Sequence, residues 1–203
     1  VNLRRINHFD QNIFDKDSIA IIHLAGKAHD LKKTTNYLEY YNVNTELTKR
    51  VYDSFLQSKI EIFIFLSSVK AIADKLSEVL LESKKPSPKT DYGKTKLLAE
   101  NYILNNEFTK NKKVFILRPA MIYGPHNKGN LLLLYNIIKR RIPWPLGRFK
   151  NNRSFCSVFN ISFIIEILIR DHSLKSNVFN ICDDKPISTN QLITLISKSL
   201  NIK

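Results

Sequence analysis

Short apolar runs alternate with longer amphipathic stretches along most of the chain. The runs are rich in β-branched and aromatic residues, as are strands that a sheet buries on both faces. The stretches between them place apolar residues at helical spacing. The predicted strands are residues 18–25, 60–66, 113–119, 154–159 and 177–182. The predicted helices are residues 36–57, 91–108, 130–140, 161–170 and 188–200.

This alternation predicts an α/β fold, because strands separated by helices form a parallel sheet that helices cover on both faces. The pattern changes beyond Gly124, where a turn-rich segment at 143–147 and a shorter strand follow. We therefore expect residues 1–125 and residues 126–203 to belong to different parts of the fold.

The formal net charge of +14 raises the alternative of a basic module that binds polyanions. Such a module needs a clustered positive face, whereas the basic residues here are spread over the whole chain. The sequence also has no zinc-finger spacing, basic heptad region or aromatic RNA-binding motif. We therefore expect no dedicated nucleic-acid recognition.

The cysteine and histidine content is typical of a reduced chain without a metal. Cys156 and Cys182 show no C-x-x-C spacing, and the five histidines are scattered. We expect no metal site and a cytoplasmic location. No run approaches the ~20 apolar residues that span a bilayer, so we expect no membrane association.

The pair Tyr92 and Lys96 is the strongest chemical signal. The two residues lie at positions i and i+4 where a helical pattern begins, so both side chains share one helix face. A nearby ammonium favours the ionised phenol and lowers the tyrosine pKa. A tyrosine tuned in this way can take a proton from an alcohol while a cofactor takes the hydride.

A second signal follows the apolar run at 60–66. This run ends in Ser67 and Ser68, and ligands of open parallel sheets bind at the carboxyl ends of the strands. The two serines are therefore expected at the mouth of a site. The run at 18–25 also ends in small residues, and the run at 113–119 ends in Arg118 and Pro119.

Five motifs occur in the order and at the spacings of one known family. They are His23-Leu24-Ala25-Gly26, Val43-Asn44-Thr45, Phe65-Leu66-Ser67-Ser68, Tyr92-x-x-x-Lys96 and Arg118-Pro119-x-x-x-Tyr123-Gly124-Pro125. On these residues, the chain resembles the extended short-chain dehydrogenases/reductases, in the NAD-dependent epimerase/dehydratase branch that acts on nucleotide sugars. The resemblance extends from about Asp17 to Leu200.

That family opens with a Gly-rich turn that binds the cofactor pyrophosphate, and this sequence has no such turn. We therefore expect an internal fragment or partial gene product that lacks the first two βα units and a C-terminal piece. The resemblance implies that residues 1–125 are the C-terminal part of a Rossmann-like NAD-binding domain. It also implies that residues 126–203 form part of a smaller α/β lobe, interleaved with that domain, that binds the sugar nucleotide.

The resemblance also implies a role for each motif residue. Tyr92 would be the general base, Lys96 would lower its pKa and hydrogen-bond the nicotinamide ribose, and Ser68 would bind the reacting sugar hydroxyl. NAD would be the cofactor, with NADP left open. The implied cofactor-binding residues are Leu24, Ala25, Lys27, Asn44, Ser67, Tyr92, Lys96, Arg118 and Pro119. The implied substrate-binding residues are Ser68, Tyr92, Asn130, Leu131 and Arg153.

Structural roles compete with these at several positions. Asn44 is also suited to tie a helix to the end of a strand, and Ser67 to end a strand. Lys27 and Arg153 are also suited to an exposed, solvated position. His23 is expected to be a packed, neutral histidine.

The implied reaction is the 4-epimerisation of a UDP-hexose or UDP-N-acetylhexosamine by transient oxidation at C4. One alternative is an NAD(P)H-dependent reductase of 4-keto sugar nucleotides. A 4,6-dehydratase ranks third, because Val69 and Lys70 stand where that enzyme has an Asp-Glu pair. Outside the enzymes, the alternative is a truncated remnant or binding module. The expected partner is a UDP-sugar, and the full-length protein is expected to be a homodimer.

Overall fold

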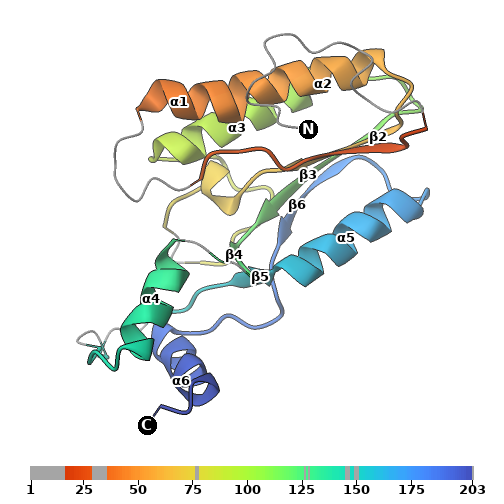
Figure 1. Ribbon diagram of the computed structural model, residues 1–203. Helices are drawn as coiled ribbons and strands as arrows, with labels where there is room; N and C mark the ends of the chain where they lie inside the picture. The colour runs from red at the N-terminus through yellow and green to blue at the C-terminus, as the bar shows by residue number, and fades with distance from the viewer. Residues whose placement is uncertain are drawn as a thin grey trace. The chain divides into compact units, whose positions relative to one another are not determined.

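The computed structural model of the chain describes residues 17–28, 36–75, 78–125, 127, 129–144, 147–148 and 151–202. These residues form two compact units (Figure 1). The first unit combines the chain up to Pro119 with the returning segment Phe163–Ile181. The second unit combines Ala120–Ser162 with the residues from Cys182 onward.

The first unit contains a four-stranded sheet in the order β1-β2-β3-β6, in which every neighbouring pair is parallel. This arrangement confirms the predicted α/β fold with a parallel sheet. Each strand lies within one of the predicted apolar runs. The strands are β1 (Ala20–His23), β2 (Ile62–Leu66), β3 (Lys113–Pro119) and β6 (Asn177–Ile181).

Helices cover both faces of this sheet. Figure 1 shows α1, α2 and α3 on one face, and the part of α5 that belongs to the first unit on the other. The helical segments are α1 (Tyr37–Tyr41), the π-helix η3 (Asn42–Glu46), α2 (Leu47–Gln57), the 3₁₀ turn η4 (Val69–Ala71), α3 (Asp91–Asn105) and α5 (Val158–Arg170).

The main core lies between α2, α3 and the sheet. The apolar side of α2 packs against alternate residues of the strands, because successive side chains of a strand point to opposite faces. Burial of these side chains stabilises the layer by roughly 1.5–3 kcal/mol for each large one. The members of this core are Ile21, Leu47, Val51, Tyr52, Phe55, Ile60, Phe63, Phe65, Ala99, Ile103, Val114 and Ile116.

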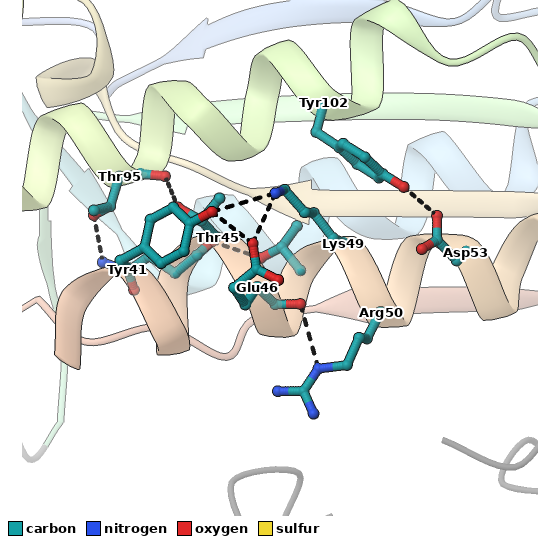
Figure 2. A network of polar contacts seen from close by, with 10 residues as sticks. Tyr41, Thr45, Glu46, Lys49, Arg50, Asp53, Thr95 and Tyr102 are labelled. Carbon is teal, nitrogen blue, oxygen red and sulfur yellow. Dashed lines mark hydrogen bonds and ion pairs between the residues drawn. The ribbon is translucent and has the colours of Figure 1, made fainter. Parts of the chain in front are cut away.

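The predicted helix at 36–57 is interrupted by the π-helical turn η3, which the sequence pattern did not predict. The wider turn buries Asn44 and Thr45 against α3, and Thr45 Oγ1 donates to Thr95 O at 2.8 Å (Figure 2). On the same helix, the Glu46 carboxylate accepts from Tyr41 Oη and Lys49 Nζ, each at 2.7 Å. Polar contacts therefore join the helical layer where α1, η3 and α3 meet.

The second unit contains a two-stranded parallel sheet and two complete helices. The last helix begins with a capping box, in which Ser188 Oγ accepts from Gln191 N and the Gln191 side chain accepts from Ser188 N. The elements are β4 (Met121–Tyr123), α4 (Asn130–Lys139), β5 (Phe155–Ser157) and α6 (Thr189–Ser199).

The prediction of a strand over 154–159 is wrong at its end. Val158 and Phe159 are the first residues of α5, because the Ser157 hydroxyl accepts from Asn160 N at 3.0 Å and so caps the helix three residues earlier than expected. The strand β4 was also not predicted, since its three residues follow β3 after one intervening residue and give no separate apolar run.

A buried lysine from a distant part of the chain, Lys112, binds carbonyl groups at the C-terminal end of α2. Lys112 Nζ donates to the carbonyl oxygens of Phe55, Ser58 and Ile60 at 2.9, 2.9 and 2.8 Å. The same ammonium lies 4.4 Å from the centroid of the Phe55 ring. A cation at a helix C-terminus satisfies carbonyls that have no partner within the helix.

We predict that Lys112→Met lowers the free energy of unfolding by about 3 kcal/mol, because three carbonyls, two of them buried, lose their charged donor. Lys110→Met, at an exposed position two residues away, is the matched control and should change it little. Urea unfolding followed by circular dichroism measures both variants. Equal midpoints for the two variants would contradict the role of Lys112.

Candidate active site

Two serines follow the carboxyl end of β2. Ser67 N donates to Leu117 O at 2.7 Å, so the sheet ladder continues one residue past the strand. Ser68 is the N-cap of η4, and its Oγ accepts from Lys70 N at 3.2 Å. The turn therefore fixes Ser68 directly beyond the end of β2, where the sequence predicted a site.

Tyr92 lies in the first turn of α3 and is half-buried. The Ser68 side chain is the polar neighbour that acts on the Tyr92 hydroxyl. Burial raises the pKa of Tyr92, and the Ser68 side chain opposes that rise. The structure thus brings together two of the three predicted catalytic side chains.

Lys96 lies one turn further along α3 and is 3 % exposed. Its Nζ donates to Leu66 O at 2.8 Å and lies 4.6 Å from the centroid of the Phe65 ring. Burial lowers the pKa of Lys96 to about 8, and the Glu100 carboxylate opposes this shift. The expected lowering of the Tyr92 pKa by Lys96 is not what this structure shows, because the ammonium is directed at the carbonyl of Leu66 and burial dominates at the phenol.

Gly93 and Asp74 position the start of α3, and the sequence analysis missed both. A Cβ atom on Gly93 would stand 2.4 Å from Lys70 O, so only glycine lets α3 approach the turn that follows Ser68. The Asp74 carboxylate accepts from Lys89 N at 2.6 Å, from Thr90 N at 3.1 Å and from Thr90 Oγ1 at 2.9 Å. For Gly93, the sequence did carry a signal, because a glycine inside a helical pattern often marks a position where another element packs closely.

The loop after β1 is held by a buried asparagine. Asn44 is fully buried, accepts from Lys27 N at 2.7 Å, and donates to Lys27 O and Thr95 Oγ1 at 3.1 Å each. The Lys27 ammonium forms an ion pair with Glu39. Asn44 therefore holds the loop through hydrogen bonds to the backbone of Lys27. This is the structural role, joining a helix to the end of a strand, that the sequence offered as an alternative to ligand contact.

The same loop approaches Lys96. A Cβ atom on Gly26 would stand 3.1 Å from Lys96 Nζ, so a small residue is needed there. Leu24 is 56 % exposed, and Ala25 packs against the main core. The small residues that end β1 thus lie next to the candidate catalytic lysine.

His23 is buried beneath this loop, as predicted for a packed, neutral histidine. Its Nε2 shares a 2.9 Å hydrogen bond with Thr48 Oγ1, and its ring stacks on Phe65 with centroids 5.6 Å apart. Burial, assisted by the Lys96 charge, lowers the pKa of His23 to about 3. The ring therefore remains neutral at physiological pH.

Arg118 is paired within the protein. Its Nε lies 3.1 Å from each Glu100 carboxylate oxygen, and its Nη2 donates to Glu100 Oε2 at 2.6 Å. Ser67 Oγ donates to the same carboxylate. Ser67, Arg118 and the neighbouring Pro119 are all buried. Within the part of the chain that the structure describes, Arg118 Nη1 has no protein partner.

The three remaining candidates lie in the second unit. Asn130 is exposed and is the first residue of α4, and Leu131 is half-buried beside it. Arg153 is exposed and forms an isolated antiparallel bridge with Ile187. The structure thus has Ser68, Tyr92 and Lys96 in the first unit, and Asn130, Leu131 and Arg153 in the second.

A parallel α/β sheet with a Ser/Tyr/Lys set beyond one strand defines a short-chain dehydrogenase/reductase of the extended type. The chain belongs to the 3-beta hydroxysteroid dehydrogenase/isomerase family, whose model matches residues 9–203. The family-level resemblance inferred from the motifs is confirmed.

Curated relatives are named as sugar 4-epimerases. The chain is 28 % identical over 191 residues to a UDP-glucose 4-epimerase of Vibrio cholerae, which covers 92 % of the chain and 58 % of the relative. It is 28 % identical over 199 residues to the N-acetyl-alpha-D-glucosaminyl-diphospho-ditrans,octacis-undecaprenol 4-epimerase of Escherichia coli O157:H7, again over 58 % of the relative. The chain thus spans somewhat more than half the length of these two proteins.

Solved structures share the fold. MoeE5 in complex with UDP-glucose and NAD superposes with a TM-score of 0.78 at 22 % identity, over 96 % of this chain and 68 % of that one. A UDP-N-acetylglucosamine 4-epimerase from Bacillus cereus superposes with a TM-score of 0.74 at 21 % identity, over 92 % of this chain and 66 % of that one. These likenesses confirm the Rossmann-like architecture.

We predict that Gly93→Ala lowers the free energy of unfolding by roughly 2–3 kcal/mol, because the new methyl group meets a backbone oxygen that cannot move freely. Gly147→Ala is the control, since a Cβ atom there meets nothing within 4 Å. Thermal unfolding compares the two variants with the parent chain. If Gly93→Ala were as stable as Gly147→Ala, the close approach of α3 would be wrong.

We also predict that His23 makes the chain sensitive to acid. The unfolded chain protonates this ring below about pH 6.5, whereas the folded chain does so only near 3. The unfolded state therefore binds more protons in this window, and stability falls as the pH falls, by about 1.4 kcal/mol per pH unit.

The measurement is urea unfolding between about pH 6.5 and 4.5. His23→Gln should flatten the slope by this amount, while His172→Gln, at an exposed position, should leave it unchanged. An identical slope in all three proteins would show that His23 is protonated in the folded state.

Proposed function

We propose that this chain contains the catalytic part of an NAD-dependent nucleotide-sugar 4-epimerase that acts on a UDP-hexose or UDP-N-acetylhexosamine. The observation that supports it most is that Ser68 follows the carboxyl end of β2, while Tyr92 and Lys96 lie one turn apart on α3 and Lys96 bonds the last residue of that strand. The names of the two curated relatives support the same reaction. The family description names steroids, but both of these relatives are named for sugars bearing a diphosphate.

The chain's residues would share the proton chemistry. Ser68 would bind the C4 hydroxyl of the sugar, and Tyr92 would remove its proton as general base. The C4 hydrogen would leave as hydride in the same step, to the NAD proposed below, and would return to the opposite face once the sugar has turned. Tyr92 would then give the proton back to the C4 oxygen, which completes the 4-epimer. The raised pKa of Tyr92 favours the reaction at alkaline pH, because only the ionised phenol accepts the proton.

Two observations in the first unit fit a dinucleotide. Small residues end β1 close to Lys96, and Arg118 Nη1 is a buried donor without a protein partner among the described residues. NAD, when bound, would supply an acceptor and donor of hydride. Lys96 would then hydrogen-bond the ribose. The residues proposed to line the cofactor are Leu24, Ala25, Lys27, Asn44, Ser67, Arg118 and Pro119.

The second unit would bind the rest of the substrate. Arg153 offers an exposed guanidinium, whose planar fork suits the oxygens of a diphosphate. Asn130 and Leu131, at the start of α4, would meet the uridine diphosphate.

We place the reaction in the cytoplasm. Cys156 and Cys182 are both free, which agrees with a reducing setting. No helix within the described ranges is long and apolar enough to span a bilayer. We propose no nucleic-acid partner and no membrane partner, and a homodimer for the full-length protein.

The test combines cofactor binding with turnover. Titration with NADH, followed by fluorescence, should show saturable binding in the micromolar range. UDP-glucose and UDP-N-acetylglucosamine, incubated with NAD and separated by chromatography, should be converted to their 4-epimers. Saturable binding without any turnover would favour a binding module instead.

We predict that Tyr92→Phe lowers turnover by about 10²–10⁴-fold, because the general base is lost, while NADH binding remains within about twofold. Tyr37→Phe, which removes the hydroxyl of a 44 % exposed tyrosine in α1, is the matched control and should keep full activity. Turnover that survives in Tyr92→Phe would rule out the proposed mechanism.

A further inference from the structure

Three successive turns of α3 contact three successive residues at the carboxyl end of β2. These residues are Leu66, which is the last of the strand, and Ser67 and Ser68, which follow it. Ser68 acts on the Tyr92 hydroxyl, Lys96 donates to Leu66 O, and Glu100 accepts from Ser67 Oγ. The three helix residues are spaced by four, so they lie on one face of α3. The three contacts on this face therefore fix the position of α3 relative to the carboxyl end of β2.

Glu100 is fully buried, yet its carboxylate has three donors. They are Ser67 Oγ, Arg118 Nε and Arg118 Nη2. A carboxylate in such a place is costly unless it is paired and hydrogen-bonded. The geometry therefore combines one buried carboxylate with two buried cations, Lys96 on the same helix and Arg118 on β3.

Several groups surround the Lys96 ammonium. From β2 come Leu66 O and the Phe65 ring, and from β1 comes the neutral ring of His23. The loop after β1 brings Gly26, and η3 brings Asn44 Oδ1 to the same place. From its own helix, Glu100 acts on it as a negative charge. Since the ring of His23 stays neutral, Glu100 is the negative group that acts on Lys96, and Arg118 on β3 shares the same carboxylate.

We propose that Glu100 is a positioning residue for the Tyr92–Lys96 pair, whose carboxylate keeps the Lys96 ammonium protonated and anchors α3 to the ends of β2 and β3. The use of that pair in catalysis rests on the proposed function, but the electrostatic role of Glu100 does not. A merely structural carboxylate would affect stability and leave the protonation of Lys96 unchanged.

The sign of the effect follows from burial. Desolvation lowers the pKa of Lys96 to about 8, and Glu100 opposes this shift. Without the carboxylate, desolvation acts alone, so Lys96 releases its proton at a lower pH. A neutral amine at this position would lose the charge-assisted hydrogen bond to Leu66 O and the cation–π contact with Phe65.

The experiment is an NMR titration of the chain with ¹³C at the lysine ε-carbon, without cofactor or substrate. The Lys96 signal is assigned as the one that is absent from Lys96→Met. We expect its midpoint to fall by about one pH unit in Glu100→Gln. Glu107→Gln, which neutralises an exposed carboxylate just beyond α3, should keep the parent midpoint. An unchanged midpoint in folded Glu100→Gln would overturn the proposal.

Glu100→Gln leaves Arg118 buried without its counter-ion and can therefore unfold the chain. For that case, the comparison is made in an Arg118→Met background. There, adding Glu100→Gln should again lower the midpoint of Lys96, and equal midpoints would overturn the proposal. Because the titration needs no turnover, failure of the epimerase assay leaves this result unaffected.

Discussion

The hydrogen bond from Lys96 Nζ to Leu66 O fastens helix α3 to the carboxyl end of β2, and the candidate active site depends on this contact. It buries an ammonium, which burial alone disfavours, so the surrounding structure must compensate. Compensation comes from the carbonyl, from the Phe65 ring and from Glu100. Gly93 and Gly26 then have to be small, because the backbone and the ammonium approach each of them closely.

The polar residues of this layer fall into two groups with different physical roles. Asn44 and Ser67 are hydrogen-bonded by other parts of the chain, so they support the site from beneath. Arg118 is paired with Glu100 through Nε and Nη2, and its Nη1 stays open among the described residues. Ser68 and Tyr92 are neighbours at the strand end, and Tyr92 is half-buried, which leaves it accessible to a substrate. A family motif therefore mixes residues that could meet a ligand with residues that hold the others in place.

The pattern of apolar runs predicted the elements that form the sheet, because strands buried on both faces need continuous apolar sequence. All four strands of that sheet lie in predicted runs, and β3 has the predicted bounds. The pattern failed where a single local contact decides the boundary. Ser157 caps α5 and converts Val158 and Phe159 from strand to helix, and η3 interrupts a helix whose apolar spacing looks continuous.

By itself, the sequence determined the α/β class, the Tyr92–Lys96 spacing and the position of Ser68 after a buried strand, since these depend on local periodicity. The family resemblance rested on the same residues. Only the tertiary structure decided that Glu100 and Arg118 form a buried pair, that Asp74 holds the start of α3, and that burial raises the pKa of Tyr92. Those features join residues 15 to 18 positions apart or depend on the loss of water, and neither distance in space nor exposure is written in the order of the residues.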